Sequence, residues 1–315
     1  MKMIFRQKHI AAACLILLML VAGTALAQNV FQEPELTIYG GTNPNDNISV
    51  SSWGGGVGTE VNQYTYGGPR SISIKPNELY QGGRVDFGKP LDLTKYFNEP
   101  DTYIQFVTKF NDTRTSMEAW AANAASPGST DIYAGTKHNK PVRRVQVMLF
   151  FDGGKSTEFQ GNVGWYKLQE DGWMAISVPF AYLKRNLNLP EYKLNRMVIT
   201  GDGNETFYVG EIRIVKDDTP VEVDAGEDKE TGKNYSILFH ATAQTGASAV
   251  KYSWDYDIRN GIQEESQGEL VSHKYANTIN IGSEELGSYV ATCTVSDVFG
   301  VKKPVTDTVN VKVNE

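Results

Sequence analysis

Aromatic side chains in glycine-rich or polar surroundings are the residues of this sequence best suited to recognition chemistry. Seven of them, including Tyr64 and Tyr66, lie outside the apolar rows of the expected strands. Five are proposed to stack on a glycan: Trp53, Trp120, Tyr133, Trp165 and Tyr166. A ring presented flat can stack on the apolar face of a sugar while polar groups around it bond the hydroxyls. Ordinary packing in the core or at its rim is the alternative for each ring. Trp120, Trp165 and Tyr166 are the stronger candidates, because they lie in expected loops without an obvious packing partner.

Residues suited to catalysis are few. After residue 27 the chain keeps three histidines and one cysteine, which are His138, His240, His273 and Cys293. The histidines lack metal-ligand spacing, and no serine lies in a strand-turn-helix motif, so neither a zinc site nor a nucleophilic triad is predicted. Cys293 lies in an apolar row and is expected to be an inert core thiol.

One run of acids has a spacing seen in some β-sandwich glycosidases. It comprises Glu222, Asp224 and Glu227. Alternate acids on a strand face one side, as such chemistry requires. Gly226 would interrupt the strand before the last acid, and no cleft is indicated around the run. We therefore predict a protein that is not an enzyme.

The N-terminus has the pattern of a secretory signal peptide. Three basic residues within the first eight precede an apolar run at 11–21, and alanines at 25 and 27 follow, so cleavage is expected after residue 27. No segment approaches the roughly 20 apolar residues of a membrane span. The signal holds three of the 30 basic residues and none of the 37 acidic ones, so residues 28–315 carry a net charge of −10. An acidic chain without basic blocks argues against a nucleic-acid partner. We expect a secreted or cell-surface protein.

Short alternating runs dominate the rest of the chain and are separated by Gly, Asn, Asp and Pro, a pattern typical of a sandwich or barrel. One inward row is expected at Val145, Val147, Leu149 and Phe151, and another at Met174, Ile176, Val178 and Phe180. In a later strand Phe207, Val209 and Val215 alternate with Tyr208, Ile212 and Ile214. The pattern stops between residues 111 and 141, which form either a loop that shapes a binding site or a plain surface insertion.

A linker is expected at residues 216–220, where two aspartates and a proline follow a completed strand. It would divide the chain into one domain at 28–216 and a second at 217–315. The second segment has short strands at immunoglobulin-like spacing, with Trp254 assigned to packing.

The second segment resembles a polycystic-kidney-disease (PKD) repeat. The resemblance rests on Val223-Asp224-Ala225-Gly226-Glu227-Asp228, Trp254-Asp255-Tyr256-Asp257, His273-Lys274-Tyr275, the run from Gly287 to Asp297, and Gly300. It implies a β-sandwich that acts as a spacer or protein-contact module. The stretch between Asp257 and Gly261 is longer than the family's usual Asp-Gly turn, so the shape of that turn is open.

The first segment resembles the galactose-binding-like jelly-roll carbohydrate-binding modules. The motifs are Gly82-Gly83-Arg84-Val85-Asp86-Phe87, Leu91-Asp92-Leu93-Thr94-Lys95-Tyr96, Gly172-Trp173 with Val178-Pro179-Phe180, and Phe207-Tyr208-Val209-Gly210-Glu211-Ile212. Such modules often have an Asp where Gly210 stands and a second acid at Glu211, and an acid here can help to bind a structural calcium ion. Glu211, with Glu33 or Glu35, is therefore a candidate calcium ligand, although calcium takes several oxygen ligands. No other cofactor is predicted.

The predicted fold class is thus all-β, with an N-terminal jelly-roll β-sandwich and a C-terminal immunoglobulin-like β-sandwich of the PKD type. The predicted function is binding of a polysaccharide or surface glycan without catalysis. The alternative is a structural or adhesion component of the cell surface or matrix with an extracellular protein as its partner.

Overall fold

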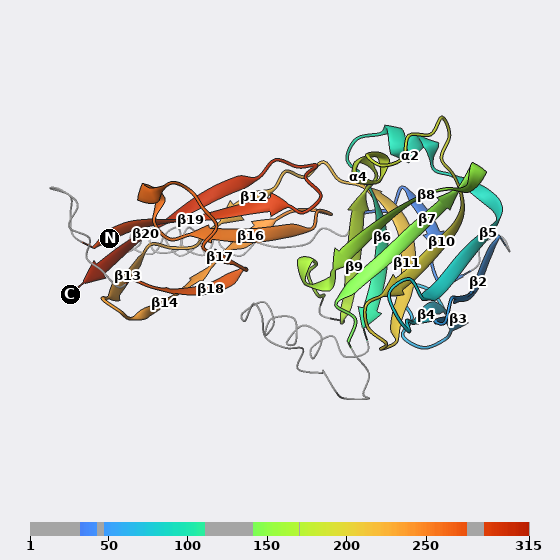
Figure 1. Ribbon diagram of the computed structural model, residues 1–315, viewed down its shortest axis with the longest axis horizontal. Helices are drawn as coiled ribbons and strands as arrows, with labels where there is room; N and C mark the ends of the chain where they lie inside the picture. The colour runs from blue at the N-terminus through green and yellow to red at the C-terminus, as the bar shows by residue number, and fades with distance from the viewer. Residues whose placement is uncertain (1–31, 43–46, 111–140, 170, 276–286, 315) are drawn as a thin grey trace, which may run out of the picture. The chain divides into compact units, whose positions relative to one another are not determined.

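The computed structural model describes residues 32–42, 47–110, 141–169, 171–275 and 287–314 (Figure 1). In these residues the chain forms strands β1 to β20, two α-helices of five residues each and three short 3₁₀ helices. The predicted all-β class is confirmed. The expected signal peptide lies outside the described residues, and no helix within them has the length and apolarity needed to span a membrane.

Strands β1 to β11 form a sandwich of two antiparallel sheets, which we call the first sandwich. One sheet has the order β3-β4-β11-β6-β9, and β1 also pairs with β11. Its strands are β1 (Leu36–Tyr39), β3 (Val57–Val61), β4 (Ser71–Lys75), β6 (Thr102–Phe110), β9 (Trp173–Pro179) and β11 (Phe207–Lys216). The other sheet has the order β2-β5-β10-β7-β8. Its strands are β2 (Ile48–Trp53), β5 (Gly82–Asp92), β7 (Arg144–Phe151), β8 (Lys155–Asn162) and β10 (Lys193–Gly201).

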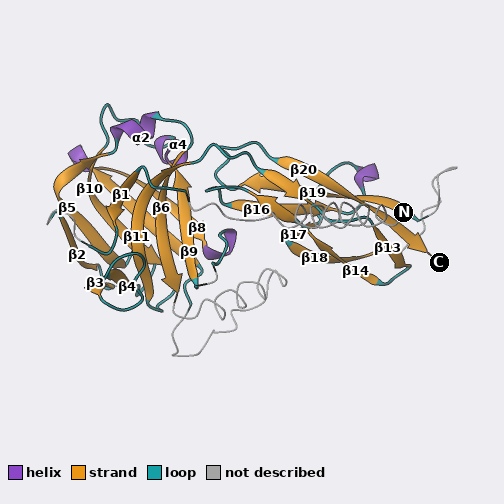
Figure 2. Cartoon of the chain, turned by 180° about the vertical axis from the view of Figure 1, so that it is seen from behind, coloured by secondary structure: helices purple, strands orange, loops and turns teal. Residues whose placement is uncertain are grey.

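The eight strands from β4 to β11 have jelly-roll connectivity. They form the four-stranded orders β4-β11-β6-β9 and β5-β10-β7-β8, so the chain crosses repeatedly between the sheets. The core between them contains both predicted inward rows, from Val145 to Phe151 and from Met174 to Phe180. Helices α2 (Thr94–Asn98) and α4 (Phe180–Lys184) lie at one end of this sandwich, and neither covers the outer face of the β2-β5-β10-β7-β8 sheet (Figures 1 and 2).

A β-bulge in β11 changes one predicted row. The register with β6 shifts between Val209 and Glu211, so Gly210 is an extra residue in the strand. Side chains after the bulge exchange faces relative to strict alternation. Phe207, Val209, Ile212 and Ile214 consequently all join the core, whereas the sequence pattern assigned Ile212 and Ile214 to the opposite face.

Strands β12 to β20 form the second sandwich, around a core of their own. A sheet of order β13-β20-β19-β16-β17 is accompanied by the pairs β14-β18 and β12-β15. The strands are β12 (Glu222–Asp224), β13 (Lys229–Gly232), β14 (Ser236–His240), β15 (Thr242–Gln244), β16 (Val250–Asp255), β17 (Ser266–Gln267), β18 (Leu270–Lys274), β19 (Ser288–Asp297) and β20 (Val305–Asn314). Trp254 and Cys293 are fully buried in this core, as predicted. The division into two domains at residue 216 remains a prediction, since residues 32–315 form one compact unit.

The turn after Trp254 is organised by the buried carboxylate of Asp255. Its Oδ1 accepts the amide of Asp257 at 2.8 Å and its Oδ2 accepts the amide of Gln263 at 2.7 Å. A single 3₁₀ turn (Ile258–Asn260) fills the space between, and Gly261 follows with a φ of 88°. The longer loop is therefore closed by one buried acid instead of a tight Asp-Gly turn.

Candidate functional site

The outer face of the β2-β5-β10-β7-β8 sheet brings together residues from four strands. Because strand side chains alternate between faces, Arg84 and Asp86 point outward when Val85 and Phe87 enter the core. The register then places Asp86 beside Arg196 of β10, and Arg196 beside Phe150 of β7. We call the surface formed by Trp53, Arg84, Asp86, Phe150 and Arg196 the Trp53 face.

Trp53 is the half-buried aromatic centre of this face. Its ring centroid is 6.1 Å from that of Phe150, with the planes tilted by 48°. The Cζ atoms of Arg84 and Arg196 lie 6.0 and 5.6 Å from the Trp53 ring centroid. These distances are those of cation–π contacts, which hold a guanidinium against an aromatic ring.

Asp86 links the two arginines. Its Oδ2 is 2.6 Å from Nε of Arg84, and its Oδ1 accepts the Nε–H of Arg196 at 2.6 Å. Arg84 Nε also donates to the Ser51 hydroxyl at 3.1 Å. The arginine side chains keep 33% and 35% of their surface exposed, and that of Asp86 keeps 22%. Both guanidinium groups are thus held through their Nε atoms, and part of each arginine side chain remains open to solvent.

This arrangement contains the kinds of chemical group that a sugar-binding site uses. A tryptophan ring with a neighbouring phenylalanine offers an apolar surface, and guanidinium N–H groups offer donors at its border. Sugar sites combine an apolar platform with a few placed polar groups in the same way. Of the three proposed aromatic residues that the structure describes, the Trp53 face contains Trp53.

The other proposed aromatic residues are placed differently. Tyr166 is buried, which corrects its assignment as a stacking residue: its ring packs where Gly161 leaves room, and its hydroxyl donates to the Ser177 carbonyl at 3.3 Å. Trp165 ends a 3₁₀ turn (Val163–Trp165) and packs half-buried against the core, so its role stays a prediction. Trp120 and Tyr133 lie outside the described residues.

A second aromatic cluster lies on the outer face of the other sheet. The ring centroids of Tyr64 and Tyr208 are 4.6 Å apart, and those of Tyr66 and Trp173 are 5.2 Å apart. Trp173 and Tyr208 are buried, whereas 51% of Tyr64 is exposed. The ammonium group of Lys109 already has a partner in this cluster, because its Nζ donates to the Asp171 carbonyl at 2.6 Å. This cluster therefore offers one exposed ring and a cation that is already bonded.

Glu211 and Glu35, two of the candidate calcium ligands, each have a cationic partner. Glu211 Oε2 accepts from Arg213 at 3.0 Å, and Glu35 Oε2 lies 3.3 Å from Lys95 Nζ. Burial raises the pKa of the Glu211 carboxyl, partly offset by the Arg213 guanidinium. No three acidic, histidine or cysteine side chains come together among the described residues. A calcium-binding role for Glu211 and Glu35 stays a prediction.

Gly210 occupies the position where the resemblance expects an aspartate. A β-carbon added to Gly210 would lie 2.8 and 2.9 Å from ring atoms of Trp173, and closer still to Cβ of Tyr66. The packed rings therefore leave no room for the side chain of an aspartate at position 210.

Two of the remaining reactive groups, Cys293 and His273, pack against other side chains of the second sandwich. Cys293 is fully buried, and burial raises the pKa of its thiol to about 12. His273 stacks on Tyr256 with centroids 4.0 Å apart, and burial lowers the pKa of its imidazole. His240 is exposed, with Nε2 3.6 Å from Glu269. His138 lies outside the described residues.

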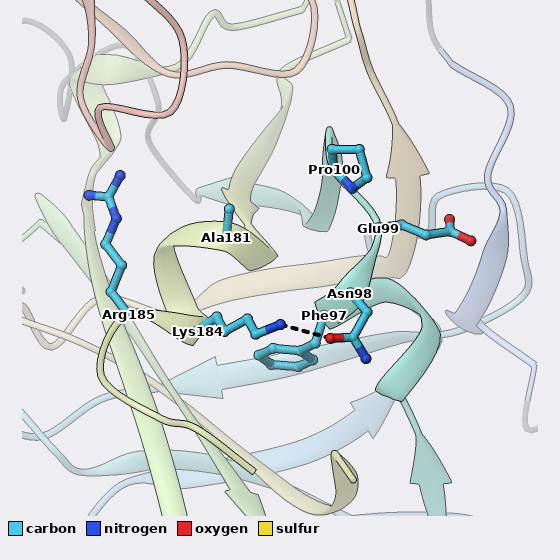
Figure 3. A pocket seen from close by; sticks show the side chains of 7 residues that line it. All are labelled: Phe97, Asn98, Glu99, Pro100, Ala181, Lys184 and Arg185. Carbon is cyan, nitrogen blue, oxygen red and sulfur yellow. Dashed lines mark hydrogen bonds between the residues drawn. The ribbon is translucent and has the colours of Figure 1, made fainter. Parts of the chain in front are cut away.

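A shallow hollow of about 390 Å³ lies where α2 meets α4 (Figure 3). It is lined by Phe97, Asn98, Glu99, Pro100, Ala181, Lys184 and Arg185. Lys184 Nζ donates to Asn98 Oδ1 at 2.7 Å across the hollow, and Arg185 donates to two backbone carbonyls. Its cations are already bonded and its phenylalanine is buried, so it is a weaker candidate than the Trp53 face.

No protein-family model and no curated protein matches the sequence. Among solved structures, a β-1,2-glucanase from Parabacteroides distasonis matches 85% of this chain at 12% identity and a TM-score of 0.33. The glycoside hydrolase domain of Endo-D from Streptococcus pneumoniae R6 matches 84% at 10% identity and a TM-score of 0.26. The adhesin domain of Epf from Streptococcus pyogenes matches 87% of this chain and 82% of its own length, at 12% identity and a TM-score of 0.22.

The two hydrolase structures correct one prediction. The prediction that the protein is not an enzyme is wrong as stated, because both hydrolases match most of the chain. The chain spans 37% of the length of each of these structures. At these identities and TM-scores the matches assign no activity, substrate or catalytic residue to this chain.

Proposed function

We propose that the protein is exported and that its first sandwich binds a polysaccharide or surface glycan on the Trp53 face. The observation that carries the proposal is a half-buried tryptophan flanked by two guanidinium groups on a sheet face that neither α-helix covers. The jelly-roll connectivity agrees with the resemblance to carbohydrate-binding modules, but the proposal itself rests on the residues of the face. Export rests on the signal-peptide pattern of residues 1–27.

Affinity electrophoresis through gels that contain soluble polysaccharides tests this proposal. Trp53→Ala should weaken binding about 30-fold, because loss of a central aromatic side chain typically costs at least about 2 kcal/mol. Trp53→Phe keeps an apolar ring and should weaken binding less than Trp53→Ala does. Tyr235→Ala removes an aromatic ring that is 72% exposed on the second sandwich and is the matched control.

The proposal fails if no polysaccharide retards the protein, or if Trp53→Ala and Tyr235→Ala bind as the unchanged protein does. Circular dichroism of each variant separates a lost site from a lost fold.

A role in adhesion with a protein partner is the second candidate. Leu238 on β14 and Leu270 on β18 are 61% and 62% exposed. Because Leu270 pairs with His240, these two leucines lie on one face as diagonal neighbours. Exposed apolar side chains side by side favour a protein contact. Attachment to cells or matrix that survives Trp53→Ala and enzymatic removal of glycans would favour this candidate.

A further inference from the structure

The outer ends of the Arg84 and Arg196 guanidinium groups have unused donors. Hydrogen bonds and ion pairs within the described residues use the Nε atom of each group, while the terminal nitrogens donate to no residue in that part of the chain. Each guanidinium is planar, and Asp86 fixes its inner edge. In a planar guanidinium one terminal N–H bond runs parallel to Nε–H, on the side of Asp86. The end-on pair, with one N–H from each terminal nitrogen, points in another direction and forms a fork for an incoming acceptor.

The charge around these groups is locally positive. Two arginines and Asp86 leave one net positive charge beside Trp53, on a chain whose residues 28–315 carry a net charge of −10. The nearest acid in the same cross-strand row as Arg84 is Glu158, which is reached through Val198 and Met148. At about 4.8 Å per strand this places its backbone roughly 14 Å from that of Arg84. Glu158 also accepts a hydrogen bond from Gln146 at 3.1 Å.

An anionic acceptor matches this fork better than a sugar hydroxyl. Carboxylate and sulfate oxygens accept charge-assisted hydrogen bonds, which are shorter and about twice as strong as neutral ones. The cation–π contacts with Trp53 hold both guanidinium groups in place, so little side-chain freedom remains to be lost on binding. A charged sugar could thus stack on the ring while its acidic group meets the arginines.

We infer that the Trp53 face takes an anionic glycan, whose carboxylate or sulfate group is bound by the terminal nitrogens of Arg84 and Arg196. This inference rests on the proposed function and names the class of its ligand.

Pairs of polysaccharides with the same backbone test the inference by affinity electrophoresis and calorimetry. One pair is polygalacturonate with its fully methyl-esterified form, and the other is dextran sulfate with dextran. The unchanged protein should bind at least one anionic member about 10-fold or more tighter than its neutral counterpart, and added salt should weaken that binding. The two pairs distinguish a carboxylate from a sulfate.

Variants assign the effect to the two arginines. Arg84→Gln and Arg196→Gln should each weaken binding of the anionic polymer about 10- to 100-fold. Arg196→Lys keeps the positive charge but not the paired N–H donors, and it should weaken binding of the anionic polymer less than Arg196→Gln does. Arg70→Gln is the control for loss of one exposed charge, since this arginine pairs with Glu60 on the other sheet. It should bind as the unchanged protein does.

Equal binding of charged and neutral members, or equal losses in Arg84→Gln and Arg70→Gln, would overturn the inference. If binding to a neutral polymer still fell in Trp53→Ala, the proposed function would survive that result. If the protein bound none of the four polymers and none of the other polysaccharides tested, both the inference and the proposed function would be refuted.

Discussion

Gly210 lies at the bulge of β11 with two aromatic side chains packed against it. A β-carbon at this position would be 2.8 and 2.9 Å from ring atoms of Trp173 and would also meet Cβ of Tyr66. Carbon atoms in good contact are about 3.5–4.0 Å apart, so Gly210→Ala requires the Trp173 ring to move by roughly 0.7 Å and Cβ of Tyr66 to move by roughly 1.1 Å. The ring is 4% exposed and has Tyr66 at 5.2 Å, which restricts that movement.

The expected magnitude follows from two opposing effects. Overpacking of this kind typically costs about 1–3 kcal/mol. Replacing glycine by alanine also reduces the conformational freedom of the unfolded chain. This raises the free energy of unfolding by about 0.4–1 kcal/mol where the backbone conformation permits alanine. Gly210 is not among the described glycines with positive φ, so both effects apply. We expect Gly210→Ala to lower the free energy of unfolding by about 1–2 kcal/mol.

Urea unfolding followed by circular dichroism measures this change. Gly88→Ala is the matched control, because Gly88 is an exposed β5 residue, its φ is not positive, and an added β-carbon meets nothing closer than Asn47 Oδ1 at 3.3 Å. This control should be neutral or stabilised by up to about 1 kcal/mol. If the two variants shift stability equally, or if Gly210→Ala is neutral, crowding by Tyr66 and Trp173 is not the reason for glycine at this position.

Two further predictions concern buried groups of the second sandwich. Cys293 should resist alkylation in the folded protein at mildly alkaline pH and react once denaturant is added, because burial raises its pKa to about 12. Mass spectrometry of the peptide that contains Cys293 checks this, and rapid labelling of the native state would contradict it. Burial lowers the pKa of His273 from its ordinary 6.5, so the folded state binds fewer protons than the unfolded state and stability falls as pH drops through that value. His273→Phe should flatten this fall between about pH 7.5 and about pH 5.5, and unchanged pH dependence of unfolding would refute the assignment.

Strand alternation by itself determined much of this fold. The rows from Val145 to Phe151 and from Met174 to Phe180 enter the core as the sequence predicts, because successive side chains of a strand point to opposite faces. The same rule makes Arg84 and Asp86 outward-facing once Val85 and Phe87 are assigned to the core. The burial of Trp254 and Cys293 follows equally from their inward rows. These are local properties that each strand carries in its own sequence.

The tertiary structure decided which outward residues meet. Trp53, Arg84, Phe150 and Arg196 are spread over more than 140 positions of the chain and become neighbours through the strand order β2-β5-β10-β7. Alternation assigns a face to each residue and says nothing about which strand lies beside it. Tyr166 and the bulge at Gly210 show the same limit: burial of the tyrosine depends on space left by Gly161, and one extra residue moves Ile212 and Ile214 into the core. The candidate site is therefore a consequence of strand pairing between distant segments, which no local pattern specifies.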